Sequence, residues 1–211
     1  MKAIIFDLDG TLYDNSRLPM WLIINCLTSM FTLKSERNSR KELMGVHFGE
    51  SKDYFKQLFA TMAKKRGISA EKAEHWYYSK YMPTMTKVLS RHYRLKKGVA
   101  EELAELRKAR IKTAVFSDYD HIIERLHAVG IDPEWFDVCI DAPSAGGLKP
   151  CRESFLHIAQ LLGENPEDIL VIGDRDDTDG QGARNSGMQF LLVNRKDPFL
   201  KDIKETNTKN K

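Results

Sequence analysis

The feature that most constrains this chain is a pair of carboxylates at the end of a short apolar run. The run Ala3–Phe6 leads directly into Asp7 and Asp9, which are separated by one leucine and followed by Gly10. Aspartate is disfavoured in strands, and two like charges in one buried site are costly. Because Gly10 permits a tight turn of the backbone, both acids can face one ligand. The pattern therefore indicates a strand, residues 3–7, that ends in a chemical site.

Beyond residue 98, helix-like and strand-like segments alternate. Apolar residues at helical spacing predict helices within 98–110, 120–130, 151–163 and 182–188. In 120–130, the predicted apolar stripe consists of Ile122, Ile123, Leu126 and Val129. Short apolar runs predict strands within 111–117, 136–141, 169–174 and 190–194. This alternation predicts an α/β fold, a Rossmann-like parallel sheet core with helices on both faces.

Residues 14–97 lack this alternation and have a helical pattern throughout. Two apolar stripes recur at helical spacing, namely Met20, Ile23, Ile24, Leu27, Met30 and Phe31, and then Phe55, Leu58, Phe59 and Met62. We interpret both as faces along which helices pack, in preference to a cofactor-binding surface. Ser69 is the predicted N-cap of a further helix. The sequence thus predicts an all-helical insertion directly after the first strand.

Chemically active residues follow four of the predicted strands. Asp7 ends the first strand, Ser117 and Asp118 end the second, the next strand precedes a loop with Lys149, and the fourth leads into the acidic stretch 174–180. In an open parallel sheet, ligands bind beyond the carboxyl ends of the strands. A single exposed loop charge is unremarkable, but four successive strands that direct acids, a hydroxyl and a lysine to one edge predict a common site.

These groups suit phosphoryl transfer. Clustered carboxylates repel one another unless a cation lies among them, and ligand sets made only of oxygen favour Mg²⁺. A metal ion and Lys149 can hold phosphate oxygens and neutralise developing charge. One carboxylate can act as a nucleophile and form an aspartyl-phosphate. A second carboxylate two residues on can protonate the leaving oxygen and later take a proton from water.

Four ordered motifs carry a resemblance to a known family. They are "DLDGT" at residues 7–11, Ser117 at a strand end, "GLKP" at 147–150, and "IGDRDDTDGQGARNSGM" at 172–188. Together they resemble the haloacid dehalogenase (HAD) superfamily of phosphohydrolases, over a span from residue 4 to about 193. The helical insertion resembles the cap domain of phosphoglycolate-phosphatase-like members. The implied division is a core of 1–13 and 98–200, a cap of 14–97, and a polar tail of 201–211.

The resemblance implies a role for each motif residue. Asp7 is the expected nucleophile and a Mg²⁺ ligand through its carboxylate. Asp9 is the expected general acid and base, and it contributes its backbone carbonyl to the metal. Ser117 and Lys149 are expected to bind the phosphoryl group, and Asp174 to be the remaining protein ligand of the metal.

The resemblance assigns two further acids less directly: a supporting acid near the metal, and an aspartate at a position where many relatives have another residue. Asp179 is the expected acid near the metal or the motif lysine, because a five-residue spacing after Asp174 resembles a common form of the motif, but Asp176 and Asp177 lie in the same stretch. Asp118 stands where many relatives carry asparagine, and this additional charge either points away or tunes selectivity.

Three functional interpretations remain open at this point. The favoured one is a Mg²⁺-dependent phosphatase that hydrolyses a small phosphorylated metabolite through an aspartyl-phosphate on Asp7. The alternatives are a phosphomutase, which returns the same phosphoryl group to a sugar, and a receiver-type phosphoacceptor module without turnover. A dehalogenase is disfavoured because relatives that cleave carbon–halogen bonds lack the second acid, which is present here as Asp9. The long insertion argues against a receiver, since a cap is useful for enclosing a small substrate and managing water.

The substrate is not specified by these motifs. The loop from Gly45 to Gly49, which contains His47 and Phe48, resembles the substrate-specificity loop of capped relatives, although a turn with a solvent-facing histidine is an equal alternative. Arg17 follows the catalytic acids and is interpreted as a surface charge in preference to an anion ligand.

Composition limits the partners. The net charge of +3 is too small to argue for nucleic acid or membrane, and no apolar run has the length of a membrane span. Cys26, Cys139 and Cys151 lack metal-binding spacing and indicate reduced thiols, hence a cytoplasmic location. We therefore expect a small phosphorylated substrate as the only partner, and a monomer or weak dimer.

Overall fold

The core of the molecule is a five-stranded parallel sheet. The computed structural model describes residues 1–194 of the chain. The strands are β1 (Ala3–Asp7), β2 (Lys112–Ser117), β3 (Val138–Asp141), β4 (Ile169–Gly173) and β5 (Gln189–Leu192). Their spatial order is β3-β2-β1-β4-β5, and every neighbouring pair is parallel. The predicted Rossmann-like α/β core is confirmed.

Strand β1 lies at the centre of the sheet. All of its residues are buried, and Ile5 pairs with Ala114 of β2 on one side and Val171 of β4 on the other. The chain order reverses here, because β2 and β3 lie to one side of β1 while β4 and β5 lie to the other. Such a reversal opens a crevice at the carboxyl ends of the central strands. Asp7, the last residue of β1, is thereby placed at the mouth of this crevice.

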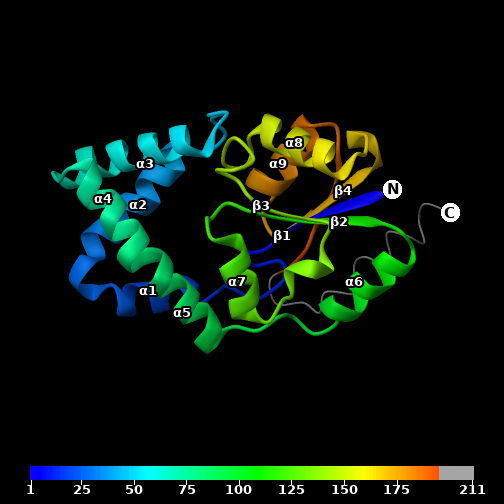
Figure 1. Cartoon of the computed structure of the whole chain (residues 1–211), viewed down its shortest axis with the longest axis horizontal. Coiled ribbons are helices and arrows are strands. Elements are labelled where there is room, and N and C mark those ends of the chain that lie inside the picture. The colour runs from blue at the N-terminus through cyan, green and yellow to red at the C-terminus, as the bar shows by residue number, and fades with distance from the viewer. Residues whose placement is uncertain (195–211) are drawn as a thin grey trace.

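Helices cover both faces of the sheet. They are α6 (Val99–Lys108), α7 (Ile122–Val129), α8 (Arg152–Leu162) and α9 (Gln181–Asn185). Figure 1 shows α8 and α9 on one face and α6 and α7 on the other. The crossover connections of the parallel strands run through these helices, so the apolar stripe of each helix packs against the sheet.

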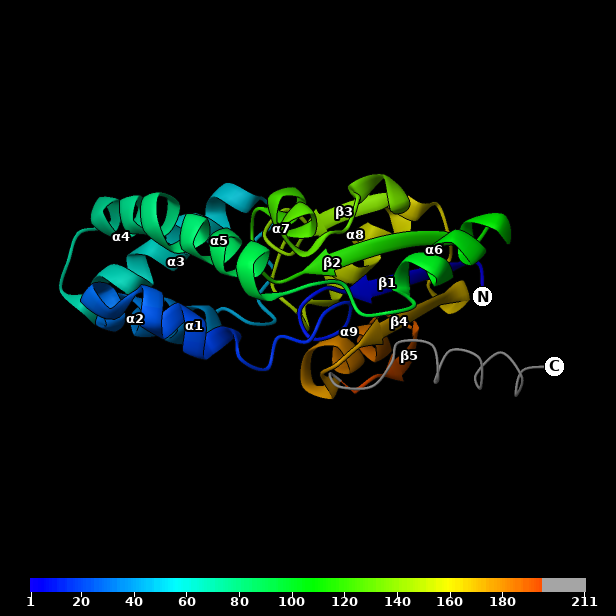
Figure 2. The same ribbon diagram turned by 90° about the horizontal axis from the view of Figure 1, so that it is seen from below.

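A helical segment is inserted between β1 and β2. It contains α1 (Leu18–Asn25), a 3₁₀ turn (Leu27–Ser29), α2 (Met30–Glu42), α3 (Ser51–Arg66), α4 (Ala70–Trp76), a π-helical turn (Tyr77–Tyr81) and α5 (Met82–His92). Figure 2 shows this segment at one end of the molecule and the N-terminus toward the other. The Oγ of Ser69 accepts a hydrogen bond from the amide of Lys72 at 3.3 Å, which confirms the predicted N-cap. The inserted helical cap predicted from the sequence is confirmed, while its boundaries at 14 and 97 remain predictions.

The two apolar stripes of the insertion have different outcomes. On α3, Leu58, Phe59 and Met62 are buried, as expected. The prediction that the first stripe is a packing face is wrong. All six of its residues, which lie between the start of α1 and the start of α2, are exposed, and the exposed fraction reaches 65% at Phe31. The buried residues are instead those of a face spaced by four, Leu18, Leu22 and Cys26. The predicted stripe required one continuous helix, but a 3₁₀ turn follows α1 and interrupts it. Apolar residues also occur on both faces of α1, so the sequence alone does not indicate which face packs.

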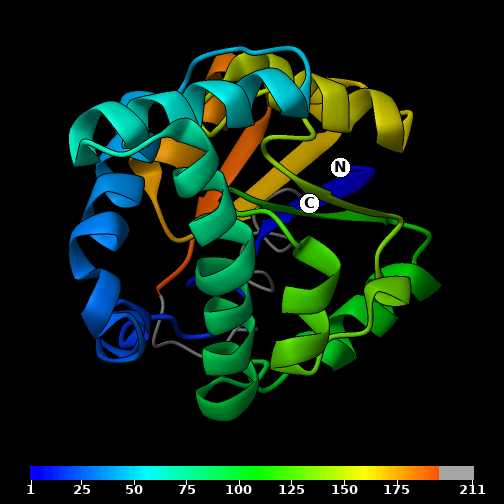
Figure 3. The ribbon, with the colours of Figure 1, turned by 60° about the vertical axis from the view of Figure 1, so that its left-hand side comes forward.

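Two of the contacts between the helical segment and the core are a pair of helices and a pair of loops. Helix α5 runs beside α7 (Figure 3). The loop 45–49 lies against the loop that precedes Lys149, where the amide of Gly45 donates to the carbonyl of Leu148 at 3.1 Å and the amide of Phe48 to that of Gly146 at 2.7 Å. No helix within residues 1–194 is long and apolar enough to cross a membrane. The predicted polar tail, 201–211, lies outside the described residues.

Candidate active site

The acids, hydroxyl and lysine expected at the strand ends lie together at the crevice. The Nζ of Lys149 donates to Oδ1 of Asp7 and to Oδ1 of Asp179, each at 2.8 Å. The Oγ of Ser117 donates to Oδ2 of Asp9 at 2.8 Å. Carboxylate oxygens of Asp7, Asp174 and Asp179 lie within 4.8 Å of one another. The parallel register of β1, β2 and β4 thus brings residues far apart in the sequence to one place.

Lys149 is a buried cation between two buried acids, with its side chain only 2% exposed. Burial alone lowers the pKa of this ammonium group, but the carboxylates of Asp179 and Asp7 raise it overall. The pKa of Asp7 is raised by burial, and the neighbouring acids reinforce that direction against the attraction of Lys149. A further cation beside Asp7 would lower that pKa and favour the ionised nucleophile.

Two glycines make room for this cluster. Gly10 has a φ of 104°, and a Cβ on it would lie 2.4 Å from Oδ2 of Asp174. A Cβ on Gly173 would lie 2.4 Å from Cγ of Asp179. Both separations are shorter than any real contact of this kind. The glycine after the acid pair is therefore required by its backbone conformation and by the approach of Asp174.

The donor set of this cluster fits a hard divalent cation. Asp7, Asp174 and Asp179 offer only carboxylate oxygens, and Mg²⁺ prefers such ligands. Oδ2 of Asp7 also accepts from the hydroxyl of Thr11 at 2.9 Å, and Asp179 is bonded to Lys149. The residues present are therefore consistent with Mg²⁺.

Asp9 is held by a guanidinium group that the sequence reasoning missed. The Nη2 of Arg125 donates to both carboxylate oxygens of Asp9, each at 2.5 Å, and its Nη1 donates to Oγ of Ser117 at 2.8 Å. The hydroxyl of Tyr13 donates to the same carboxylate. Burial raises the pKa of Asp9, but the charge and hydrogen bonds of Arg125 outweigh it, and the pKa is lowered overall. Asp9 is therefore held as a carboxylate.

A signal for Arg125 is present in the sequence. Residues 122, 125, 126 and 129 follow the spacing of one helical face, and all four are buried in α7. The prediction that Ile123 belongs to the buried stripe is wrong, because its side chain is 42% exposed. Arg125 takes its place with no exposed surface. A charged residue within an otherwise apolar stripe indicates a buried ion pair, and the acids at the strand ends were the available partners.

The acids that follow Asp174 differ in their exposure and in their ion-pair partners. Asp176 is exposed and paired with Arg184, and Asp177 is exposed and paired with Arg175. Asp179 is buried against Lys149, as expected of the supporting acid. Oδ1 of Asp118 accepts a hydrogen bond from the backbone amide of the motif lysine at 2.9 Å, so this carboxylate supports the segment that carries that lysine.

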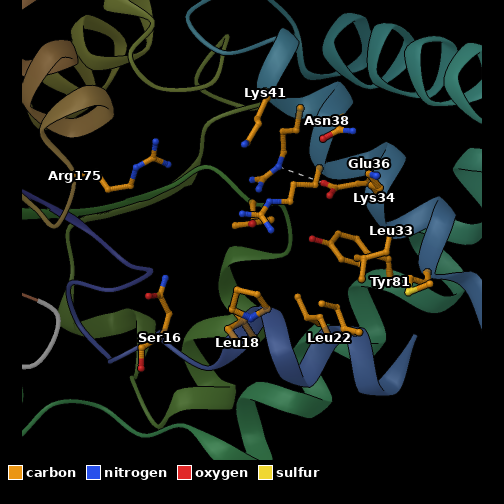
Figure 4. Close-up of a pocket in the computed structure, with 17 residues that line it drawn as sticks. Ser16, Leu18, Leu22, Leu33, Lys34, Glu36, Asn38, Lys41, Tyr81 and Arg175 are labelled. Carbon is orange, nitrogen blue, oxygen red and sulfur yellow. Dashed lines mark ion pairs between the residues drawn. The ribbon is translucent and has the colours of Figure 1, made fainter. Parts of the chain in front are cut away.

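A basic hollow of about 630 Å³ opens between the helical segment and this cluster. One face of α2 lines it with Lys34, Arg37, Asn38 and Lys41, and Arg175 lines it from the core. Figure 4 shows Arg175 extending toward Lys41 across the hollow. Arg40 forms an ion pair with Glu36, Nε to Oε1 3.3 Å, and its guanidinium stacks 3.6 Å above the ring of Tyr119. Tyr119 lines the hollow, and its backbone amide donates to Oγ of Ser117 at 3.3 Å, so the hollow lies next to the candidate phosphate site.

Comparison with known proteins decides the family. A family model described as haloacid dehalogenase-like hydrolase matches residues 1–187. The chain belongs to this family. N-acylneuraminate-9-phosphatase of Rattus norvegicus is 28% identical over 209 residues, which cover 91% of this chain and 82% of that protein. Glyceraldehyde 3-phosphate phosphatase of Methanopyrus kandleri is also 28% identical over 209 residues, covering 92% and 84%.

A solved structure supports the same fold. The crystal structure of β-phosphoglucomutase from Clostridium difficile superposes with a TM-score of 0.70 at 20% identity, covering 100% of this chain and 97% of that one. This likeness concerns the fold. The haloacid dehalogenase-like hydrolase described here is an enzyme, and its relatives by sequence include phosphatases.

Two further sequence expectations can be placed on this haloacid dehalogenase-like hydrolase. Arg17 is exposed and is not among the residues that line the basic hollow, which agrees with a surface charge. In the loop 45–49, the ring of Phe48 packs against Tyr54, with centroids 5.6 Å apart. His47 is exposed but lies over Gly146 of the core, beside the segment that carries Lys149.

Proposed function

We propose that this hydrolase is a Mg²⁺-dependent phosphatase that cleaves a small phosphomonoester through an aspartyl-phosphate on Asp7. The observation that carries the proposal is the pairing of two acids with different partners. Asp7 lies 2.8 Å from the ammonium group of Lys149, while Asp9 is held as a carboxylate by Arg125. One acid is thus beside a charge-neutralising cation, and the other is fixed nearby as a proton acceptor.

In the first step, a carboxylate oxygen of Asp7 attacks the phosphorus and the bond to the leaving oxygen breaks. Lys149 and Ser117 hold the phosphoryl oxygens, and the buried lysine offsets charge that develops on them. Asp9 donates a proton to the leaving alcohol oxygen, and it must first take up that proton from solvent, because Arg125 favours its carboxylate form. A bound Mg²⁺, held by Asp7 and Asp174 with the backbone carbonyl of Asp9, would supply electrophilic stabilisation of the phosphoryl charge.

In the second step, water attacks the aspartyl-phosphate and Asp9 takes its proton. The hydrogen bonds from Arg125 and Tyr13 stabilise the carboxylate form that this step requires. Asp179 keeps Lys149 charged and aimed at Asp7. The step releases inorganic phosphate and restores the free carboxylate of Asp7.

The basic hollow supports a substrate with a second anionic group. Lys34, Arg37 and Lys41 of α2 line a space that lies next to the phosphate site. Arg175 extends toward Lys41 across it (Figure 4). Among the described residues that line the hollow, the one acid is Glu36, and it is paired with Arg40. Positive charge from several side chains in one concave site favours an anion. The proposed substrate class is a phosphorylated metabolite that also carries a carboxylate or a second phosphate.

Phosphate release from matched pairs of phosphomonoesters tests this proposal. Each pair consists of a sugar phosphate and its counterpart with an added carboxylate or phosphate. We expect a lower KM for the member with the added anionic group, and the Lys41→Gln and Arg37→Gln proteins should lose that preference while kcat is little changed. Lys64→Gln, at the last turn of α3 outside the hollow, is the control. Equal KM values for both members of every pair would contradict the substrate class.

The phosphomutase remains the second candidate, because a β-phosphoglucomutase shares the fold. A mutase would transfer the phosphoryl group of a sugar phosphate to a second position of a sugar with little release of inorganic phosphate. The non-catalytic phosphoacceptor module is disfavoured by membership of a hydrolase family. The cytoplasmic location and the monomer or weak dimer remain predictions.

A further inference from the structure

A second cluster of metal-binding side chains lies where the helical segment meets the core. His47 belongs to the loop 45–49, Cys151 precedes α8, and Glu153 is in the first turn of that helix. The Sγ of Cys151 lies 4.0 Å from Nδ1 of His47 and 3.4 Å from Oε2 of Glu153. One ligand atom from each residue lies within 4.8 Å of the others. None of the three has a role in the proposed phosphatase reaction.

The backbone brings these side chains together from both sides of the contact. The carbonyl of Gly146 accepts the amides of Phe48 at 2.7 Å and Gly49 at 3.3 Å. A Cβ on Gly146 would lie 3.1 Å from Cε1 of His47, and a Cβ on Gly147 would lie 2.3 Å from the carbonyl oxygen of Val46. Only glycines at both positions let the loop and the imidazole ring approach so closely. The local backbone therefore fixes the approach of the loop 45–49 to the segment before Cys151, while the exposed side chains of His47 and Glu153 can still adjust.

The donor atoms differ from those of the catalytic cluster. Imidazole nitrogen, thiolate sulfur and carboxylate oxygen form a mixed, softer set that suits Zn²⁺ and is poorly matched to Mg²⁺. With Zn–S near 2.3 Å and Zn–N near 2.0 Å, tetrahedral ligands lie about 3.5 Å apart. The separations of 4.0 and 3.4 Å approach this value, and the exposed His47 and Glu153 can adjust without disturbing the core. Burial raises the pKa of the Cys151 thiol, and the carboxylate of Glu153 adds to that direction, so the bound metal must displace the thiol proton.

We propose that His47, Cys151 and Glu153 bind one Zn²⁺ ion at the seam between the helical segment and the core, with water at the fourth position. On binding, the thiol of Cys151 gives its proton to solvent and the sulfur becomes a metal ligand. Because Cys151 follows Lys149 by two residues, the bound ion ties the loop 45–49 to the segment that carries the phosphate-binding lysine. The bound ion, which we call the clasp, keeps the loop 45–49 in contact with the segment before Lys149.

Cobalt spectroscopy of the full chain tests the site independently of phosphatase activity. Co²⁺ is titrated in saturating Mg²⁺, which occupies the oxygen-only cluster and gives no sulfur signal. We expect a thiolate-to-cobalt charge-transfer band that saturates at one ion per chain and disappears when Zn²⁺ is added. The Cys151→Ser protein should lack the band, while Cys26→Ser and Cys139→Ser, in cysteines outside the cluster, should retain it. Absence of the band in the unaltered protein overturns the proposal.

His47→Ala supplies a variant that leaves the core intact, since this side chain is exposed. Its Zn²⁺ affinity, measured by competition with a chromophoric chelator, should fall by more than about tenfold. His157→Ala is the matched control. This exposed histidine lines a hollow of about 420 Å³ together with His47 and Glu153, but it is not in the cluster. Equal affinities of the His47→Ala and unaltered proteins overturn the proposal.

Hydrogen exchange tests the clasp itself. The amides of Gly45 and Phe48 donate to core carbonyls across the seam. Zn²⁺ should slow their exchange in the unaltered protein and leave it unchanged in His47→Ala. Identical exchange with and without Zn²⁺ in the unaltered protein overturns the clasp. None of these measurements uses a phosphorylated substrate, so their outcome is separate from that of the proposed reaction.

Discussion

The guanidinium group of Arg125 bonds both carboxylate oxygens of Asp9 through Nη2 and the hydroxyl of Ser117 through Nη1. The residue expected to move protons and a residue expected to bind phosphate are thus joined by one buried cation. Asp9 follows β1, Ser117 ends β2 and Arg125 lies on α7, so the parallel pairing of the two strands creates this unit. Its members should respond to substitution as a group.

Arg125→Met leaves the carboxylate of Asp9 buried without its charged partner. We expect the free energy of unfolding to fall by about 3 kcal/mol or more, because removing one partner of a buried ion pair leaves an uncompensated charge. Turnover should also fall, since the pKa of Asp9 rises when the guanidinium is removed. Chemical denaturation and steady-state phosphate release measure the two effects.

The control for this variant is Arg184→Met, in an exposed arginine paired with Asp176. It should change stability by no more than about 0.5 kcal/mol. Arg125→Lys should be intermediate, because an ammonium group restores the charge but not the planar two-oxygen contact. If Arg125→Met were as stable and active as Arg184→Met, the ion pair would have no role.

The stabilisation from this ion pair should depend on pH. Arg125 lowers the pKa of Asp9 in the folded state relative to an unfolded value near 3.9. An acid with a depressed pKa contributes stability that is present above the unfolded value and is lost as pH falls through the folded one. The stability difference between the unaltered and Arg125→Met proteins should therefore shrink as pH falls. The decrease begins at the raised pKa of Asp9 in the variant and continues below about pH 4, where Asp9 of the unaltered protein also takes up a proton. A difference that grows on acidification would contradict the assignment.

Sequence patterns anticipated the sheet and the gathering of Asp7, Ser117 and Lys149, because strand ends in a parallel sheet share one edge. They did not anticipate the buried face of α1, since apolar residues occur on both of its sides and the choice between them is made by tertiary packing. Arg125 was missed for a related reason. Its burial depends on a partner, Asp9, that is distant in the sequence and close only in the folded chain.

Asp7→Asn removes the charge of the proposed nucleophile and keeps its size. Phosphate release should fall by more than about 1,000-fold, because no covalent intermediate can form. The fold should persist, since Lys149 retains its bond to Asp179. Asp176→Asn, in an exposed acid of the same strand-end region, is the matched control and should retain full activity. Release at the unaltered rate by Asp7→Asn would exclude the covalent mechanism.

Removal of divalent metal should abolish activity reversibly. Excess chelator should stop phosphate release and added Mg²⁺ should restore it, because Asp7 and Asp174 offer oxygen ligands suited to that ion. Ca²⁺ should restore it poorly, since its larger and more variable coordination shell misplaces the nucleophile and phosphate. Thermal melts should show that the metal-free protein remains folded. Full activity in excess chelator would refute the metal requirement.

Asp9→Asn separates proton transfer from simple charge stabilisation. An alkyl phosphate expels a poor leaving group that needs a proton, whereas an aryl phosphate expels a stable phenolate. The variant should therefore lose far more activity toward alkyl than aryl esters, while Asp7 and the metal ligands stay in place. If Asp9 also takes the proton from water, the aryl ester should give a burst of phenol followed by a stalled phosphoenzyme. The asparagine carbonyl can still accept from Arg125, and a thermal melt verifies that the fold is kept. An equal loss for both esters with no trapped phosphoenzyme would mean that Asp9 only shapes the site through Arg125, and its assignment as acid and base would be wrong.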